Sequence, residues 1–232
     1  MIKNYVIFDF VGTIATTEPC RESILLSLLE SQGVSEVGLN RVVDAYEKTD
    51  GQFTYSSISE AKDSNYRPNF YLNYNLALVK YLGVESSVSV DALTEEFLNY
   101  DIKWKLFDDT LFILTSLEQA GFKLGILSNF GPSLKLLVEK LVGEKVKFSH
   151  VMDSASTGLE KPDLDFFNYF LAHAQLNPEN CIFIGDSYDL DYIPATEVGI
   201  KTFLVDRKMA DISSSSAKMP LTEIAKKILE EV

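Results

Sequence analysis

The stretch YVIFDFVGT at residues 5–13 decides the fold of this chain. Its four leading apolar residues predict a buried strand that ends at Asp9, and Gly12 indicates a tight turn directly afterwards. A second apolar run, at residues 181–184, leads in the same way into Asp186, with Asp191 close behind. Two strand-end acid sites so far apart in sequence predict one site, formed where the carboxyl ends of neighbouring parallel strands meet. Clustered carboxylates repel one another, so the pattern favours a hard divalent cation between them.

The second half of the chain alternates between short apolar runs and segments with helical spacing of apolar residues. The runs predict strands at residues 123–127, 148–152, 181–184 and 201–205. The intervening segments predict helices at residues 132–141, 164–174, 190–198 and 221–229. Such alternation predicts an α/β fold: a doubly wound, Rossmann-like parallel sheet with helices on both faces. The serine-rich residues 211–218 predict a mobile surface loop.

The segment between the first strand and residue 123 has helical rather than strand patterns. Apolar stripes at residues 24–29, 70–82 and 91–100 predict three helices. A connection of this length is too long for a simple loop. We therefore predict an inserted α-helical cap domain at residues 17–104, and a catalytic core made of residues 1–16 and 105–232.

Composition excludes several classes of protein. The chain has 232 residues and a formal net charge of −13, which argues against a protein that coats nucleic acid or anionic lipid. Its two cysteines are too few for a disulfide framework, and no apolar run reaches membrane-spanning length. The expected location is therefore the cytoplasm, and the sequence gives no indication of the oligomeric state.

Four segments converge if all strand ends point the same way. Asp9 supplies a carboxylate nucleophile, and Ser128 supplies a hydroxyl after the strand at residues 123–127. Lys161 supplies a cation, and Asp186 with Asp191 supplies a metal-binding pair. These are the chemical groups needed to transfer a phosphoryl group through an aspartyl-phosphate.

The four motifs, in this order and each near the end of an apolar run, resemble the haloacid dehalogenase superfamily. The resemblance covers roughly residues 1–16 and 105–206 and includes the long helical segment between the first two motifs. It implies that Asp9, Ser128 and Lys161 are catalytic, and that Mg²⁺ is held by Asp9, the Val11 carbonyl, Asp186 and Asp191. It further implies a small phosphorylated substrate, bound by residues that include Gly12, Thr13 and Asn129. Two histidines, His150 and His173, are expected to have packing or surface roles.

One position departs from the phosphatases of that family. Most of them carry a second aspartate where this chain has Val11, and that aspartate serves as general acid and base, a role commonly worth about 10²–10⁴ in rate. Three alternatives therefore stand beside a metal-dependent phosphohydrolase. One is a 2-haloacid dehalogenase, in which Asp9 would displace halide without Mg²⁺. Another is a phosphonate-cleaving enzyme with a Schiff-base lysine, for which Lys48 and Lys62 are cap lysines. The last is a binding or regulatory protein with little turnover.

Overall fold

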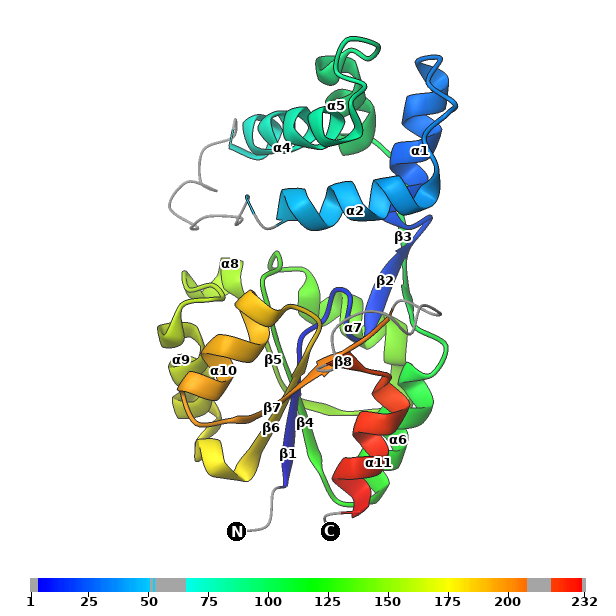
Figure 1. Cartoon of the computed structure of the whole chain (residues 1–232). Helices are drawn as coiled ribbons and strands as arrows, with labels where there is room; N and C mark the ends of the chain where they lie inside the picture. The colour runs from blue at the N-terminus through cyan, green and yellow to red at the C-terminus, as the bar shows by residue number, and fades with distance from the viewer. Residues whose placement is uncertain (1–3, 51, 53–65, 208–217, 231–232) are drawn as a thin grey trace. The chain divides into compact units, whose positions relative to one another are not determined.

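The computed structural model describes residues 4–50, 52, 66–207 and 218–230 (Figure 1). The chain divides into two compact units, which we call the core unit (residues 1–16 and 104–232) and the helical unit (residues 17–103). Most of the predicted serine-rich loop, residues 211–217, lies outside the described residues, as does Lys62. In the part of the chain that is described, no helix combines the length and the apolar character needed to cross a membrane.

The core unit is built on a six-stranded sheet in which every adjacent pair is parallel. The strand order is β5-β4-β1-β6-β7-β8. The bounds are β1 Tyr5–Phe8, β4 Lys123–Ser128, β5 Phe148–Asp153, β6 Cys181–Gly185, β7 Lys201–Val205 and β8 Lys218–Met219. β1 lies at the centre, with β4 and β6 paired to its two edges. The predicted α/β class is confirmed.

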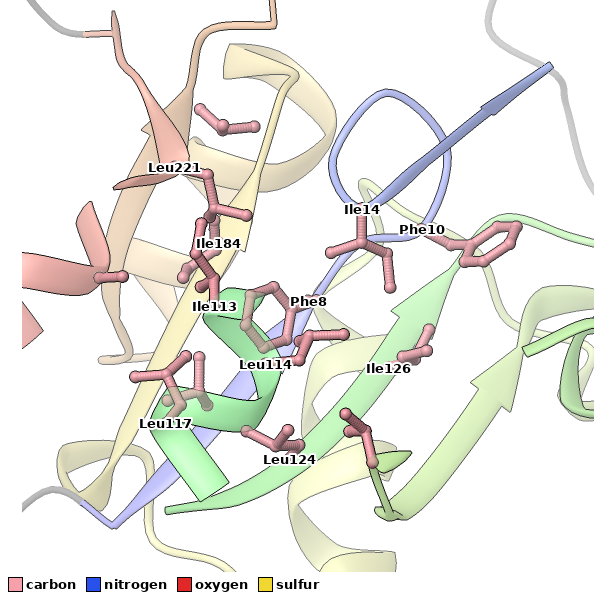
Figure 2. Close-up of a cluster of buried hydrophobic side chains, with 14 of the residues drawn as sticks. Phe8, Phe10, Ile14, Ile113, Leu114, Leu117, Leu124, Ile126, Ile184 and Leu221 are labelled. Atoms are coloured by element: carbon pink, nitrogen blue, oxygen red, sulfur yellow. The ribbon is translucent and has the colours of Figure 1, made fainter. Parts of the chain in front are cut away.

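Side chains of β1 alternate between the two faces of the sheet, as the strand period requires. Val6 and Phe8 enter one apolar cluster, while Tyr5 and Ile7 enter another on the opposite face. Figure 2 shows Phe8 in the first cluster, packed with Leu114 and side chains of the neighbouring strands. Burial on both faces explains why this strand is a continuous apolar run.

Helices cover both faces of the sheet (Figure 1). One face packs against α6 (Thr110–Gln119), α7 (Leu134–Val142) and α11 (Leu221–Glu230), whose buried residues belong to the cluster around Phe8. The other face packs against α9 (Leu164–Ala174) and α10 (Ile193–Glu197). Short turns complete the unit: η1 Gly143–Lys145, α8 Ser154–Thr157, η2 Pro178–Asn180 and the π-helical η3 Tyr188–Tyr192.

The helical unit contains α1 (Arg21–Ser31), α2 (Leu39–Asp50), α4 (Tyr66–Leu82) and α5 (Val90–Leu98). Its own apolar cluster includes Leu25 and Leu29 of α1, Leu78 of α4 and Leu93 of α5. The unit therefore buries a core without residues of the sheet.

Two short strands were not anticipated from the sequence. β2 (Ala15–Glu18) and β3 (Lys103–Leu106) pair with each other in a separate two-stranded sheet. They carry the chain out of the core unit and back into it, and they leave the six-stranded sheet uninterrupted. A single helix was expected at residues 190–198, but this segment begins in η3 and becomes α-helical only at Ile193.

Candidate active site

Three neighbouring strands bring the first site residues together. In β1, Phe8 is in register with Ile126 of β4 and Ile184 of β6. Asp9, Ser128 and Asp186 stand at or just after the ends of these three strands. They therefore lie at nearly the same level, at the carboxyl end of the sheet. The backbone N–H of Asp9 still donates to the Ile184 carbonyl at 2.9 Å, so the sheet ladder continues up to the nucleophile candidate.

The Asp9 carboxylate is buried and held by side chains from two other segments. Its Oδ1 accepts from Ser128 Oγ at 2.9 Å and from Lys161 Nζ at 2.7 Å. Its Oδ2 has a longer contact, 3.4 Å, with the hydroxyl of Thr13. The carboxylate is thus fixed in orientation by donors, which is the arrangement that a positioned nucleophile requires.

Lys161 is buried among acids. Its ammonium donates to Asp9 and also to Asp191 Oδ1, at 2.5 Å. Burial by itself would lower the pKa of Lys161, but the carboxylates of Asp191 and Asp9 outweigh it and the pKa is raised. The side chain is therefore a permanent cation at the centre of the site.

Asn129 has a role that its sequence position did not indicate. Its side-chain Oδ1 accepts from the Lys161 backbone N–H at 2.8 Å, and its Nδ2 donates to the Lys161 carbonyl at 2.8 Å. This reciprocal pair ties the loop after β4 to the loop that carries the lysine. The expectation that Asn129 binds substrate through its backbone amide stays a prediction.

Asp9, Asp186 and Asp191 form an acidic cluster whose oxygen atoms lie within 4.8 Å of one another. Burial and the charges of Asp9 and Asp191 raise the pKa of Asp186 to about 7. Burial likewise raises the pKa of Asp191, against the effect of Lys161. With all three acids ionised, the buried ammonium of Lys161 balances one charge, and the exposed ammonium of Lys218 donates to the Asp186 carbonyl at 2.8 Å. A divalent cation would neutralise the negative charge that remains among the carboxylates. Carboxylate oxygens are the ligands that Mg²⁺ prefers, so the donor set fits such an ion.

Two glycines let the chain approach these carboxylates closely. A Cβ on Gly12 would lie 2.5 Å from Asp186 Oδ2, and one on Gly185 would lie 2.4 Å from the Asp191 side chain. Gly12 also has a φ of +76°, a conformation that other residues adopt at a cost. Any side chain at either position would displace the acids that make the cluster.

The remaining predicted residues divide into those near the site and those away from it. Val11 lies in the loop after β1 with 41 % of its surface exposed. Asp189 and Lys48 are exposed. His150 Nδ1 lies 2.7 Å from the Tyr5 hydroxyl, at the opposite end of β1 from Asp9. Its ring also lies 5.9 Å from that of His173, so both histidines belong to a packing cluster.

Sequence analysis missed Arg207, which lies in the site region. Arg207, just after β7, donates to the Thr13 carbonyl, to Asp109 and to Thr110 Oγ1. An isolated arginine after a strand carries no pattern of its own. Only the folded chain reveals that it contacts the loop following Asp9.

Known proteins are similar to this chain in sequence and in architecture. A family model described as haloacid dehalogenase-like hydrolase matches residues 6–205. Haloacid dehalogenase-like hydrolase domain-containing protein 3 of Xenopus laevis is 29 % identical over 60 % of this chain. That match covers 58 % of the relative, and matches to its bovine and mouse counterparts cover 50 % and 45 % of those proteins. The chain therefore spans about half the length of these relatives.

One further relative and one solved structure match over a greater length. The glyceraldehyde 3-phosphate phosphatase of Methanocaldococcus jannaschii is 30 % identical over 87 % of this chain and 84 % of its own. The solved structure of the hydrolase YfnB from Bacillus subtilis, bound to magnesium, has a TM-score of 0.65. It is 21 % identical and covers 98 % of this chain and 99 % of its own, which establishes a shared fold.

Proposed function

This chain belongs to the haloacid dehalogenase-like hydrolase family, and we propose that it is a metal-dependent phosphohydrolase acting on a small phosphorylated metabolite. The observation that carries the proposal is the buried Asp9 carboxylate, held between Ser128 and Lys161 with Asp186 and Asp191 beside it. The glyceraldehyde 3-phosphate phosphatase of Methanocaldococcus jannaschii, which matches over most of its length, supports the same reaction class. We propose residues 17–104 as a cap domain that selects the substrate.

The proposed reaction has two steps at Asp9. A carboxylate oxygen attacks phosphorus, the bond to the leaving oxygen breaks, and an aspartyl-phosphate forms. Water then attacks that phosphorus, which releases inorganic phosphate and restores the carboxylate. Ser128 donates a hydrogen bond to a phosphoryl oxygen, while Lys161 neutralises charge that develops during transfer.

A divalent cation fits the acidic cluster. Asp9, Asp186, Asp191 and the Val11 carbonyl would hold Mg²⁺, which would screen the phosphoryl charge from the carboxylates. Without such an ion, an anionic substrate would approach a group of three acids whose charge the buried ammonium of Lys161 balances only in part. Metal dependence is therefore part of the proposal.

Val11 limits the classes of phosphorylated substrate that we propose. Valine offers a carbonyl but no side-chain proton donor, so the leaving group departs with little protonation or takes its proton from another source, such as solvent or a residue of the proposed cap. Aryl phosphates, acyl phosphates and phosphoanhydrides have such leaving groups. Losing a general acid costs about 10²–10⁴ in rate, and this cost falls mainly on alkyl phosphates.

Hydrolysis assays test the proposal directly. An aryl phosphate, an acyl phosphate and glyceraldehyde 3-phosphate would be assayed with Mg²⁺ or EDTA on the wild type, Asp9→Asn and Asp189→Asn. We expect turnover that needs both Mg²⁺ and Asp9, slower for glyceraldehyde 3-phosphate, an alkyl phosphate, than for the aryl and acyl phosphates. Asp189→Asn should be as active as the wild type because that carboxylate is exposed. Absence of turnover across the panel would favour a binding or regulatory protein.

The apolar residue at position 11 also favours a second candidate, a 2-haloacid dehalogenase. In that reaction Asp9 displaces halide from carbon, and no metal is required. Halide release from a 2-haloacid in EDTA, lost in Asp9→Asn, would establish it. The acidic cluster supports the phosphohydrolase instead, because a metal-free reaction has no use for three adjacent carboxylates.

A further inference from the structure

We propose that Arg207 is a positioning residue that fixes the Asp9 loop, defined here as residues 9–15, for phosphoryl transfer. The inference rests on the proposed function. Arg207 lies just beyond β7, and its Nε and Nη2 both donate to the Thr13 carbonyl, at 2.8 and 2.6 Å. A carbonyl oxygen has two lone pairs, so this acceptor is saturated by a single guanidinium.

The guanidinium is itself held in place on its other sides. Nη1 donates to Asp109 Oδ1 at 2.6 Å, and the group lies 4.3 Å from the centre of the Phe107 ring. Only 13 % of the arginine side chain is exposed. A planar, ion-paired and stacked guanidinium has little freedom, so the atom that it binds is also fixed.

The next carbonyl of the loop is held through the same group. Arg207 Nη2 donates to Thr110 Oγ1 at 3.2 Å, and that hydroxyl donates to the Ile14 carbonyl at 3.1 Å. The backbone N–H of Phe107 reaches the same carbonyl at 3.2 Å. Two consecutive carbonyls of the loop are therefore anchored, that of Thr13 to Arg207 after β7 and that of Ile14 to the segment that follows β3.

These anchors act on Asp9 through a tight turn. The N–H groups of Ile14 and Ala15 both donate to the Phe10 carbonyl, at 3.1 and 3.0 Å, so the far end of the turn is tied to the residue after Asp9. The Thr13 side chain contacts the Asp9 carboxylate itself. Gly12 lies so close to Asp186 that the loop has little room to shift.

Lysine cannot replace this arginine. A lysine ammonium is a point charge and cannot present two parallel donors to one carbonyl while also pairing with Asp109. The proposal therefore predicts that the shape of the group matters as well as its charge. Arg207→Lys and Arg207→Ala separate these two contributions.

Arg41 offers a matched control. Its Nη2 donates to the Leu82 carbonyl at 2.7 Å within the helical unit, so Arg41→Ala also removes a guanidinium bound to a backbone carbonyl. Kinetics of aryl phosphate hydrolysis with Mg²⁺ would be measured for the three variants and the wild type. Amide hydrogen exchange of residues 10–15 would be measured on the same proteins.

We expect Arg207→Ala to lower kcat about 10- to 100-fold, because small misplacements of a reacting group have effects of this size. KM should change little, exchange at residues 13–15 should accelerate, and added guanidinium at concentrations well below denaturing ones should restore part of kcat. Arg207→Lys should remain impaired, whereas Arg41→Ala should match the wild type in both measurements.

The proposal is overturned if Arg207→Ala or Arg207→Lys keeps the kcat of Arg41→Ala, or if exchange of the Asp9 loop is unchanged. Failure of the proposed function gives a different result, namely a wild type without turnover on any phosphate. In that case loop exchange still decides the role of Arg207: acceleration in Arg207→Ala but not in Arg41→Ala supports it, and equal exchange refutes it.

Discussion

Replacing Lys161 with methionine tests whether the ammonium holds the acidic cluster together. The side chain is 4 % exposed and donates to Asp9 at 2.7 Å and to Asp191 at 2.5 Å. Methionine keeps much of the volume and removes the charge. Breaking a buried ion pair by removing one partner costs about 3–5 kcal/mol. At roughly 2–4 °C per kcal/mol for a chain of this size, the expected decrease in Tm is about 6–20 °C.

The pH dependence of this decrease distinguishes electrostatics from packing. The pKa of Asp186 is raised from 3.8 to about 7, so the folded state binds a proton more readily than the unfolded state between these values. Stability from this group is present at low pH and is lost as the pH rises through about 7. Loss of Lys161 adds to that effect, so the decrease in Tm should be larger at pH 8 than at pH 5.

The decrease in Tm is measured by thermal unfolding in EDTA at pH 5 and pH 8, with circular dichroism as the signal. Lys135→Met is a matched control, because Lys135 is exposed on α7. Adding Mg²⁺ to Lys161→Met should recover part of the lost Tm. A decrease no larger than that of Lys135→Met, or an equal decrease at both pH values, would refute the reasoning.

Three further variants test other parts of the site. Val11→Asp should raise turnover of alkyl phosphates more than that of aryl phosphates, because alkoxides need protonation most; equal gains in kcat would contradict this. Asp186→Asn should raise Tm in EDTA, since it removes a charge that repels Asp9 and Asp191, and should abolish stabilisation by Mg²⁺ in a thermal shift titration; an unchanged Mg²⁺ response would exclude Asp186 as a ligand. Asn129→Ala should destabilise the protein by about 1–3 kcal/mol, because two hydrogen bonds to Lys161 are lost, and should lower kcat; chemical denaturation and kinetics measure both, and wild-type values would contradict the positioning role.

The sheet could be predicted from sequence because its strands are buried on both faces. Runs such as residues 5–8 and 181–184 then lack any polar interruption, and an aspartate follows each strand where the chain leaves the sheet. Since all strands are parallel, strand-end residues must meet at one edge. The juxtaposition of Asp9, Ser128 and Asp186 follows from that rule alone.

Other features depend on tertiary contacts that leave little trace in the sequence. The bounds of α6 were not predicted, because Phe112 is 75 % exposed and obscures the polar face that would mark an amphipathic helix. β2 and β3 are four residues each, too short for a clear alternation. The contacts of Asn129 with Lys161 and of Arg207 with Thr13 join segments far apart in the chain, and the partner atoms in these contacts are backbone atoms, which every residue possesses.

The central position of β1 has a consequence for synthesis on the ribosome. Phe8 pairs with Ile126 on one edge and Ile184 on the other, so this strand lacks its second neighbour until more than three quarters of the chain has been made. The helical unit is contiguous and buries its own core, so it is able to fold first. The apolar strand β1 therefore remains unpaired on one edge until β6 has been synthesised. Chaperone capture of nascent chains should accordingly be strongest before residue 184 has left the exit tunnel.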